Sequence, residues 1–147
     1  STAMIKVTCG LIFSEDKVFL CRRNPKKSLG GYWEFPGGKV EPLESLDACL
    51  ERELQEELDM DVDVIRHFLT VQHHYENFSI ELISFICDFK SSTFSMKDHD
   101  AYEWIDPESI LDWNLAPADI PIAKALIELT SSKDTTSRCS QRANARD

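Results

Sequence analysis

Long apolar runs, paired cysteines and basic residues are all scarce in this sequence. No apolar run approaches the ~20 residues that a membrane-spanning helix requires. The chain does not open with a basic stretch followed by an apolar one, so we expect no membrane anchor, no secretory signal and a cytoplasmic protein. Residues 1–3 precede Met4 and are interpreted as an expression scar.

The five cysteines are dispersed, and no two of them form a Cys-x-x-Cys pair. An odd, scattered set favours reduced thiols over a disulfide framework or a zinc site. Free cysteine behaves as a small apolar residue, so most of the five are expected in the core. They are Cys9, Cys21, Cys49, Cys87 and Cys139.

Basic residues are outnumbered, 16 against 26 acidic ones, and the formal charge is −10. This balance opposes the broad phosphate-binding surface of DNA- and RNA-binding domains, so no nucleic-acid polymer is expected as a partner. It does not oppose a phosphorylated substrate that binds together with a metal ion, because the ion reverses the local field.

The length of 147 residues suits one domain with its own core. Apolar, β-rich segments at residues 5–13 and 17–21 predict one hairpin, and those at 62–75 and 79–89 predict a second. A short strand is expected at 102–105. Hairpins dominate and strict strand–helix alternation is missing, so the pattern predicts a mixed α+β domain rather than a doubly wound one.

Three helices are predicted. Leucines that recur every four residues indicate an amphipathic helix over residues 43–59. A brief helix should open at Asp106, and a longer one should reach residue 129 with Asp119 as its N-cap. Residues 131–147 are polar and have little to bury, so they are predicted to be a disordered tail and the domain spans residues 4–130.

Between Glu44 and Glu57 the predicted helix carries six carboxylates and a single base, Arg52. At 100° per residue, Glu53, Glu56 and Glu57 fall beside the leucine stripe, at the margin of the core. Such neighbours repel one another, and partial burial disfavours each anion further. Two interpretations stay open: a solvated acidic face, or a site for a hard cation such as Mg²⁺. The preceding Gly37-Gly38 turn, whose N–H groups suit an anion, favours the second.

The spacing of these residues resembles the Nudix box, G-x5-E-x7-R-E-U-x-E-E-x-G-U, where U is aliphatic. The matching positions are Gly38, Glu44, Arg52, Glu53, Leu54, Glu56 and Glu57. One position departs, because Asp59 stands where the box has glycine. Asp adopts the left-handed conformation of a helix terminus more readily than most residues.

The resemblance extends over roughly residues 6–129 and points to the MutT-like branch of the family. Residues 33–39 read WEFPGGK, Asp98-His99 precede Trp104, and residues 117–121 read PADIP. The implied fold is an α/β/α sandwich around a mixed, hairpin-containing sheet.

The resemblance also implies roles for single residues. Arg52 would orient a glutamate, Glu44 would pair within the box, and Glu53 or Glu56 would act as the general base. The implied ligands of Mg²⁺, or of Mn²⁺, are Glu53, Glu56, Glu57, Asp98 and the Gly37 backbone. The implied substrate-binding residues are Arg23, Phe35, Gly38, Lys39, Phe78 and Asp119.

The implied reaction is hydrolysis of a nucleoside triphosphate to the monophosphate and pyrophosphate, in sanitation of the nucleotide pool. A carboxylate at Asp119 would accept from a base amino group, so CTP-type nucleotides and 8-oxo-dGTP are both candidate substrates. His73, His74 and Tyr75 could line the same pocket. A Nudix hydrolase of another nucleoside diphosphate derivative and a catalytically silent ligand-binding module stay open, as do a monomer and a homodimer.

Overall fold

The computed structural model describes residues 4–131. The predictions for the scar at 1–3 and for residues 132–147 of the tail lie outside this range. Ser131, predicted as the first residue of the disordered tail, is instead the last described residue of a helix. Within it, no helix is long and apolar enough to cross a membrane.

Strands account for a larger share of the described chain than helices do. The elements are β1 (Met4–Ser14), β2 (Lys17–Arg23), β3 (Trp33–Glu34), β4 (Gly37–Lys39), α1 (Leu46–Leu58), β5 (Met60–His74), β6 (Ser79–Ser92), β7 (His99–Ile105) and the 3₁₀ helices η1 (Pro107–Asp112) and η2 (Pro117–Asp119). A further helix covers residues 120–131.

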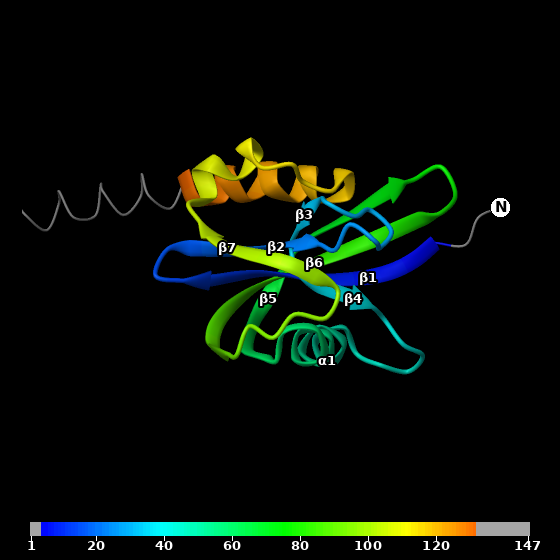
Figure 1. Cartoon of the computed structure of the whole chain (residues 1–147), viewed down its shortest axis with the longest axis horizontal. Coiled ribbons are helices and arrows are strands. Elements are labelled where there is room, and N and C mark those ends of the chain that lie inside the picture. Colours follow the sequence, from blue (N-terminus) through cyan, green and yellow to red (C-terminus); the bar gives the residue numbers. More distant parts are fainter. Residues whose placement is uncertain (1–3, 132–147) are drawn as a thin grey trace, which may run out of the picture.

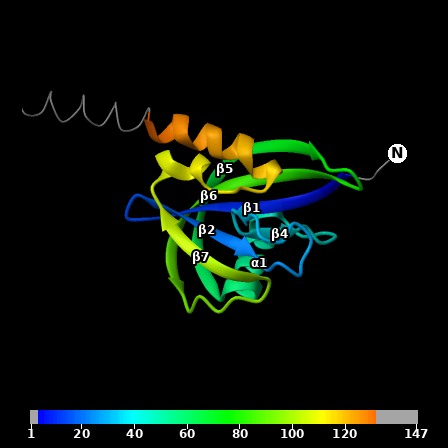
Figure 2. The same ribbon diagram turned by 45° about the horizontal axis from the view of Figure 1, so that its top comes forward.

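The strands form one mixed sheet in the order β3-β2-β1-β6-β5, with β4 paired to β1 and β7 paired to β2. Strands β1 and β6 run parallel, and the other pairs are antiparallel. Helix α1 covers one face of the sheet, while η1 and the helix at 120–131 cover the other (Figures 1 and 2). The predicted mixed α+β class and the three layers of the sandwich are therefore confirmed.

Both predicted hairpins form, and their turns have a local cause. The β1–β2 turn places Glu15 and Asp16 at φ 48° and 67°, as a two-residue type I′ turn requires. Strands β5 and β6 start or end a few residues beyond the predicted limits, because their ladder continues to the pair Met60–Ser92. Strand β7 likewise begins at His99 rather than at residue 102.

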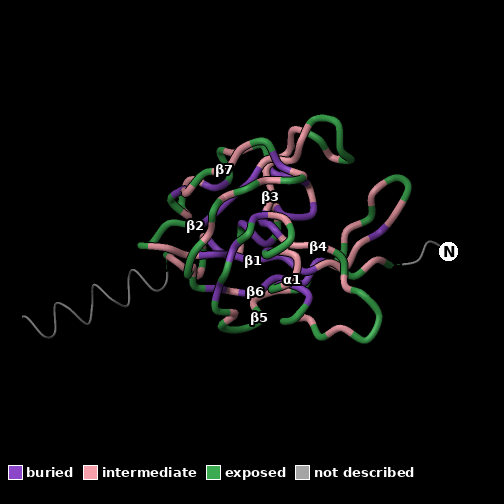
Figure 3. Tube along the Cα trace, turned by 60° about the horizontal axis from the view of Figure 1, so that its bottom comes forward, coloured by how far each residue is buried: buried purple, intermediate pink, exposed green. Residues whose placement is uncertain are grey.

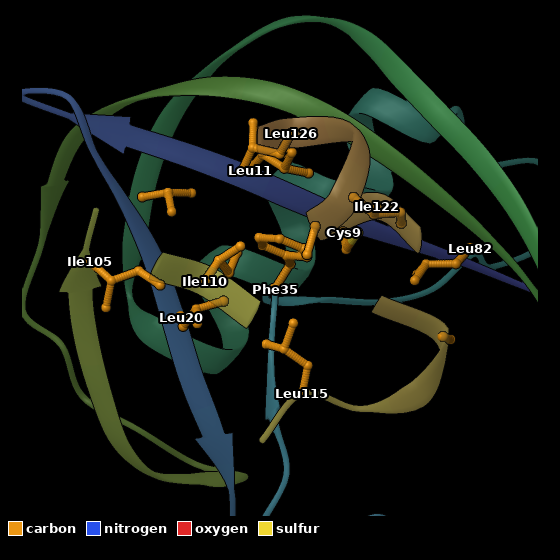
Figure 4. Packing of buried hydrophobic residues seen from close by; sticks show 13 residues of the cluster. Cys9, Leu11, Leu20, Phe35, Leu82, Ile105, Ile110, Leu115, Ile122 and Leu126 are labelled. Atoms are coloured by element: carbon orange, nitrogen blue, oxygen red, sulfur yellow. The ribbon is translucent and has the colours of Figure 1, made fainter. Parts of the chain in front are cut away.

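The sheet separates two apolar cores. On the side of the helix at 120–131, Leu11, Phe35 and Leu126 belong to one buried cluster (Figure 4). On the other side, the leucine stripe of α1 packs against Ile12 and Phe19 in a second cluster. Buried segments accordingly follow the centre of the sheet and the inner face of α1 (Figure 3). Each fully buried leucine contributes about 1.5–3 kcal/mol to folding.

Cysteine placement agrees with the sequence analysis. Cys9, Cys21, Cys49 and Cys87 are buried and free of disulfides. Cys139 lies outside the described residues.

Helix α1 begins later than residue 43, because Leu43 has a φ of 65° and is fully exposed. Ser45 is the N-cap, and its side chain accepts a hydrogen bond from the Ala48 N–H. At the other end Asp59 adopts the left-handed conformation, with φ 50° and ψ 43°. Its carboxylate accepts from Gln55 Nε2 at 2.6 Å and from Thr93 Oγ1 at 2.9 Å. A glycine at this position, as in the Nudix box, has no side chain and could make neither hydrogen bond.

Substitutions at Asp59 should separate the backbone cost from the side-chain bonds. Both Asp59→Ala and Asp59→Gly lose the two hydrogen bonds, but only alanine suffers the left-handed conformation. We expect Asp59→Ala to lower the free energy of unfolding by about 1–2 kcal/mol more than Asp59→Gly. Urea denaturation measures both, and equal losses would contradict the backbone argument.

Candidate active site

Strand β4 brings the glycine turn against the acidic helix. Gly37 and Gly38 pair antiparallel with β1, which fixes their backbone beneath α1. A Cβ added at Gly38 would collide with the carboxyl group of Glu53. Glu53 therefore lies directly on the Gly38 backbone, in a space that only glycine leaves open.

Arg52 is the centre of the acidic cluster. Its guanidinium binds Glu44 with both arms, from Nε to Oε2 at 2.7 Å and from Nη2 to Oε1 at 3.0 Å. Nη1 donates to Glu53 at 2.9 Å and to Glu56 at 3.2 Å, and Nη2 also donates to the Lys39 carbonyl at 3.1 Å. The hydrogen bonds from Arg52 lower the pKa of Glu44 to about 2. One cation thus joins three glutamates to the backbone of β4.

Glu57 has a different surrounding. Burial, and then the neighbouring Asp98 carboxyl group, raise the pKa of Glu57 to about 7. Its Oε2 is buried with no hydrogen-bond partner among the described residues. A buried carboxylate oxygen without a donor is costly unless a positive charge stabilises it, and oxygen ligands suit Mg²⁺. The donor set around Glu57 therefore fits the predicted divalent cation.

The acidic residues are not equally placed. The Glu53 side chain is 14% exposed and the Glu56 side chain 53% exposed. The expectation that all three glutamates lie at the margin of the core is wrong for Glu56, because it points almost opposite to the leucine stripe on the helical wheel. Burial also raises the pKa of Glu53.

A compact group of potential metal ligands lies outside the acidic helix α1. Within residues 4–131, one group of three has all its ligand atoms within 4.8 Å of one another: Cys21, Glu34 and His99. The predicted carboxylate ligands on α1 do not meet this spacing. Sequence reasoning missed the group because its members lie on three strands far apart in the chain.

A cavity of about 480 Å³ opens beside the glycine turn. All six residues expected to bind substrate line it, together with the Gly37 backbone. They are Arg23, Phe35, Gly38, Lys39, Phe78 and Asp119. Tyr75 lines it too, whereas His73 and His74 do not. Cavities of 300–1,000 Å³ with a few polar groups on apolar walls are typical of small-molecule sites.

Asp119 is a buried residue of the cavity lining, and its side chain does not act as the expected N-cap. It belongs to η2, and its Oδ2 accepts from the Phe35 N–H at 2.8 Å. Burial, and then the charge of Glu34, raise the pKa of Asp119 well above its usual range. This favours the protonated acid, which has a donor as well as acceptors, where the sequence analysis assumed an acceptor only.

The aromatic residues divide between wall and core. Phe35 is 3% exposed and belongs to the buried cluster, so it forms the floor of the cavity. Phe78 is half-buried, and its ring lies 5.0 Å from that of Tyr75 between centroids. Tyr75 is held by the Ala118 N–H, which donates to its hydroxyl at 3.2 Å.

Arg23 and Lys39 are the cationic residues among those that line the cavity. Arg23 Nε donates to the Ser28 carbonyl at 2.8 Å, and Nη1 lies 3.5 Å from Glu34 Oε2. These contacts hold the guanidinium while leaving donors for a further acceptor, because arginine has five N–H groups.

Comparison with known proteins defines the class of this protein, a hydrolase that acts on phosphoric anhydrides. Residues 8–125 match the NUDIX domain. The chain therefore belongs to the NUDIX family, in its MutT-like branch.

Several relatives share most of this chain. A CTP pyrophosphohydrolase of Escherichia coli K12 is 35% identical over 130 residues, which cover 88% of this chain and 96% of the relative. An 8-oxo-dGTP diphosphatase of Proteus vulgaris is 39% identical over 83 residues, or 56% of this chain and 74% of the relative. The solution structure of the E. coli ORF135 protein superposes with a TM-score of 0.79 at 36% identity, covering 89% of this chain and 94% of that one.

The two glycines of β4 should respond differently to alanine. At Gly38 the added methyl group meets a movable carboxyl group, whereas at Gly37 it meets the Thr8 carbonyl and the Cys9 backbone. Gly38→Ala should therefore fold but displace Glu53, and we expect about a 100-fold loss of hydrolytic activity. Gly37→Ala should instead lower Tm. Assays beside thermal unfolding test this, and full activity in Gly38→Ala would refute the contact.

Proposed function

We propose that this protein hydrolyses a nucleoside triphosphate to the monophosphate and pyrophosphate, with Mg²⁺ or Mn²⁺, and that it sanitises the nucleotide pool. The observation that carries this is the single cavity. Its lining brings together cationic Lys39 and the glycine backbone with the aromatic Phe78 and the carboxyl group of Asp119. Such a cavity suits a ligand with a charged end and a planar, partly polar end.

The triphosphate end would bind next to α1. Arg23 and Lys39 offer cationic donors to phosphate oxygens, and the planar fork of arginine suits two of them at once. Glu53, Glu56 and Glu57 would hold the divalent ion, with Asp98 and the Gly37 backbone as further ligands. A bound divalent ion neutralises phosphate charge and lowers the pKa of the attacking water.

Of the two candidates for the general base, Glu53 is the better placed. It lies on the Gly38 backbone that lines the cavity, while most of the Glu56 side chain faces solvent. Burial raises the pKa of Glu53, which makes its carboxylate a stronger base than an ordinary glutamate. Arg52 would hold Glu53 in place through the bond to one oxygen, Oε1, leaving Oε2 for the proton.

Cytosine fits the base end best. The hydroxyl of a protonated Asp119 would donate to cytosine N3, and Oδ2, which accepts from the Phe35 N–H with one lone pair, would accept from the N4 amino group with the other. The relative named CTP pyrophosphohydrolase supports the same choice, since the match covers 96% of its length. The relatives named 8-oxo-dGTP diphosphatases make 8-oxo-dGTP the second substrate to test.

A substitution at Glu57 tests the metal site. Glu57→Gln keeps the shape of the side chain but removes its charge, so pyrophosphate release with saturating Mg²⁺ should fall at least ~100-fold. Glu51→Gln, an exposed change on the same helix, should stay within about twofold of the unchanged protein. Undiminished turnover in Glu57→Gln would remove the ligand assignment.

A substitution at Asp119 tests the base. In Asp119→Asn the amide oxygen would accept from the Phe35 N–H, leaving an NH₂ group that donates only. We expect kcat/KM for CTP and dCTP to fall about 10-fold or more relative to that for 8-oxo-dGTP. A screen for pyrophosphate release over canonical, oxidised and methylated nucleotides gives the reference. Equal losses for all bases would show that Asp119 does not select the base.

A further inference from the structure

Three potential metal ligands meet on neighbouring strands beside the cavity. Cys21 on β2 is the Cα partner of Glu34 on β3, and β7 flanks β2 on its other side with His99 at its start. His99 Nε2 lies 2.8 Å from Glu34 Oε2. The sulfur, nitrogen and oxygen donors all lie within 4.8 Å of one another, and we call them the Cys21–Glu34–His99 cluster.

The cluster is almost dry. Cys21 is 0% exposed, the His99 side chain 2% and the Glu34 side chain 17%. His99 Nδ1 is buried and has no hydrogen-bond partner among the described residues, so the bond to Glu34 is the one contact that holds the imidazole. The Cys21 thiol makes only a long hydrogen bond, to the Glu34 carbonyl at 3.7 Å. Ligation would therefore break few existing bonds.

The donor types select the ion. Thiolate and imidazole ligands suit Zn²⁺, whereas the all-oxygen carboxylates of α1 suit Mg²⁺. A tetrahedral zinc site sets its donors about 3.3–3.6 Å apart. The ligand atoms of His99 and Glu34 are 2.8 Å apart, and the other two pairs of ligand atoms are at most 4.8 Å apart. Each ligand atom therefore needs to move by only about 1 Å to reach the tetrahedral separations.

We propose that the Cys21–Glu34–His99 cluster binds Zn²⁺ or a similar thiophilic divalent cation, separately from the cation of the acidic helix. The Cys21 thiol would release its proton to solvent, and neutral His99 and one Glu34 oxygen would complete three protein ligands. Glu34 lines the cavity, so the fourth position is open to water from that side.

A cation bound at this cluster would weaken nucleotide binding through its effect on Arg23. Glu34 Oε2 is both the ligand oxygen nearest His99 and the ion-pair partner of Arg23 Nη1, at 3.5 Å. A cation on Glu34 would neutralise that partner and repel the guanidinium. This step rests on the proposed function: Zn²⁺ would raise KM for the nucleotide by displacing the phosphate-binding arginine.

Cobalt provides an optical test of the site. With the acidic site saturated with Mg²⁺, Co²⁺ is titrated into the full chain. We expect about one equivalent to give a thiolate-to-cobalt charge-transfer band and tetrahedral d–d bands, which Zn²⁺ then abolishes. Cys21→Ser should lose the charge-transfer band. Cys87→Ser, the same change at another fully buried cysteine of the same apolar cluster as Cys21, should keep it. Far-ultraviolet circular dichroism verifies that both variants fold.

No band in the unchanged protein, or a band that survives Cys21→Ser, would overturn the site. Steady-state kinetics with Zn²⁺ test the coupling to Arg23 separately from the optical titration. Zn²⁺ should raise KM at least ~10-fold, with little change in kcat, in the unchanged protein and in Cys87→Ser but not in Cys21→Ser. An optical band without that KM effect would overturn the coupling to Arg23. If no nucleotide is hydrolysed at all, the proposed function fails while the cobalt result still decides the site.

Discussion

The guanidinium of Arg52 is the interaction on which the acidic side of this protein depends. It binds both oxygens of Glu44, one oxygen each of Glu53 and Glu56, and the Lys39 carbonyl. A lysine could not replace it, because a point charge lacks the planar fork that binds Glu44 with two parallel bonds. The helix, the glycine strand and the loop between them are therefore joined at one side chain. Carboxylates that would otherwise repel one another are kept at fixed positions.

The sequence predicts well whatever depends on local periodicity and on motif spacing. The four-residue recurrence of leucine located α1, and the spacing from Gly38 to Glu57 anticipated which residues would meet around Arg52. Residues whose partners are set by strand register escaped prediction. Cys21, Glu34 and His99 meet only because β3 and β7 both pair with β2, and no local pattern carries that information. Asp98 lies beside Glu57 on a loop that no local pattern places, and only the family resemblance led us to expect the two carboxyl groups together.

Asp119 shows how a local signal can mislead. An aspartate followed by a proline is a strong helix-start pattern, and a helix does begin there. The side chain, however, is committed to the backbone of Phe35, 84 residues earlier in the chain. Burial at that position changes its chemistry as well as its partner, since it shifts the carboxyl group towards its protonated form. Sequence can identify such a residue as important without showing which hydrogen-bonding face it presents.

The parallel pairing of β1 with β6 has a consequence for how the chain folds. Met4 pairs with Ser79 and Phe13 with Asp88, so the centre of the sheet joins segments separated by 75 residues. Pairings of such high contact order form slowly, because the entropy cost of closing the intervening loop comes before any stabilising contact is made. During synthesis β1 can pair with β2 and β4 long before β6 emerges, and until then it presents an open, apolar edge. The strand that seats the glycine turn is thus also the segment most exposed to intermolecular pairing in a nascent chain.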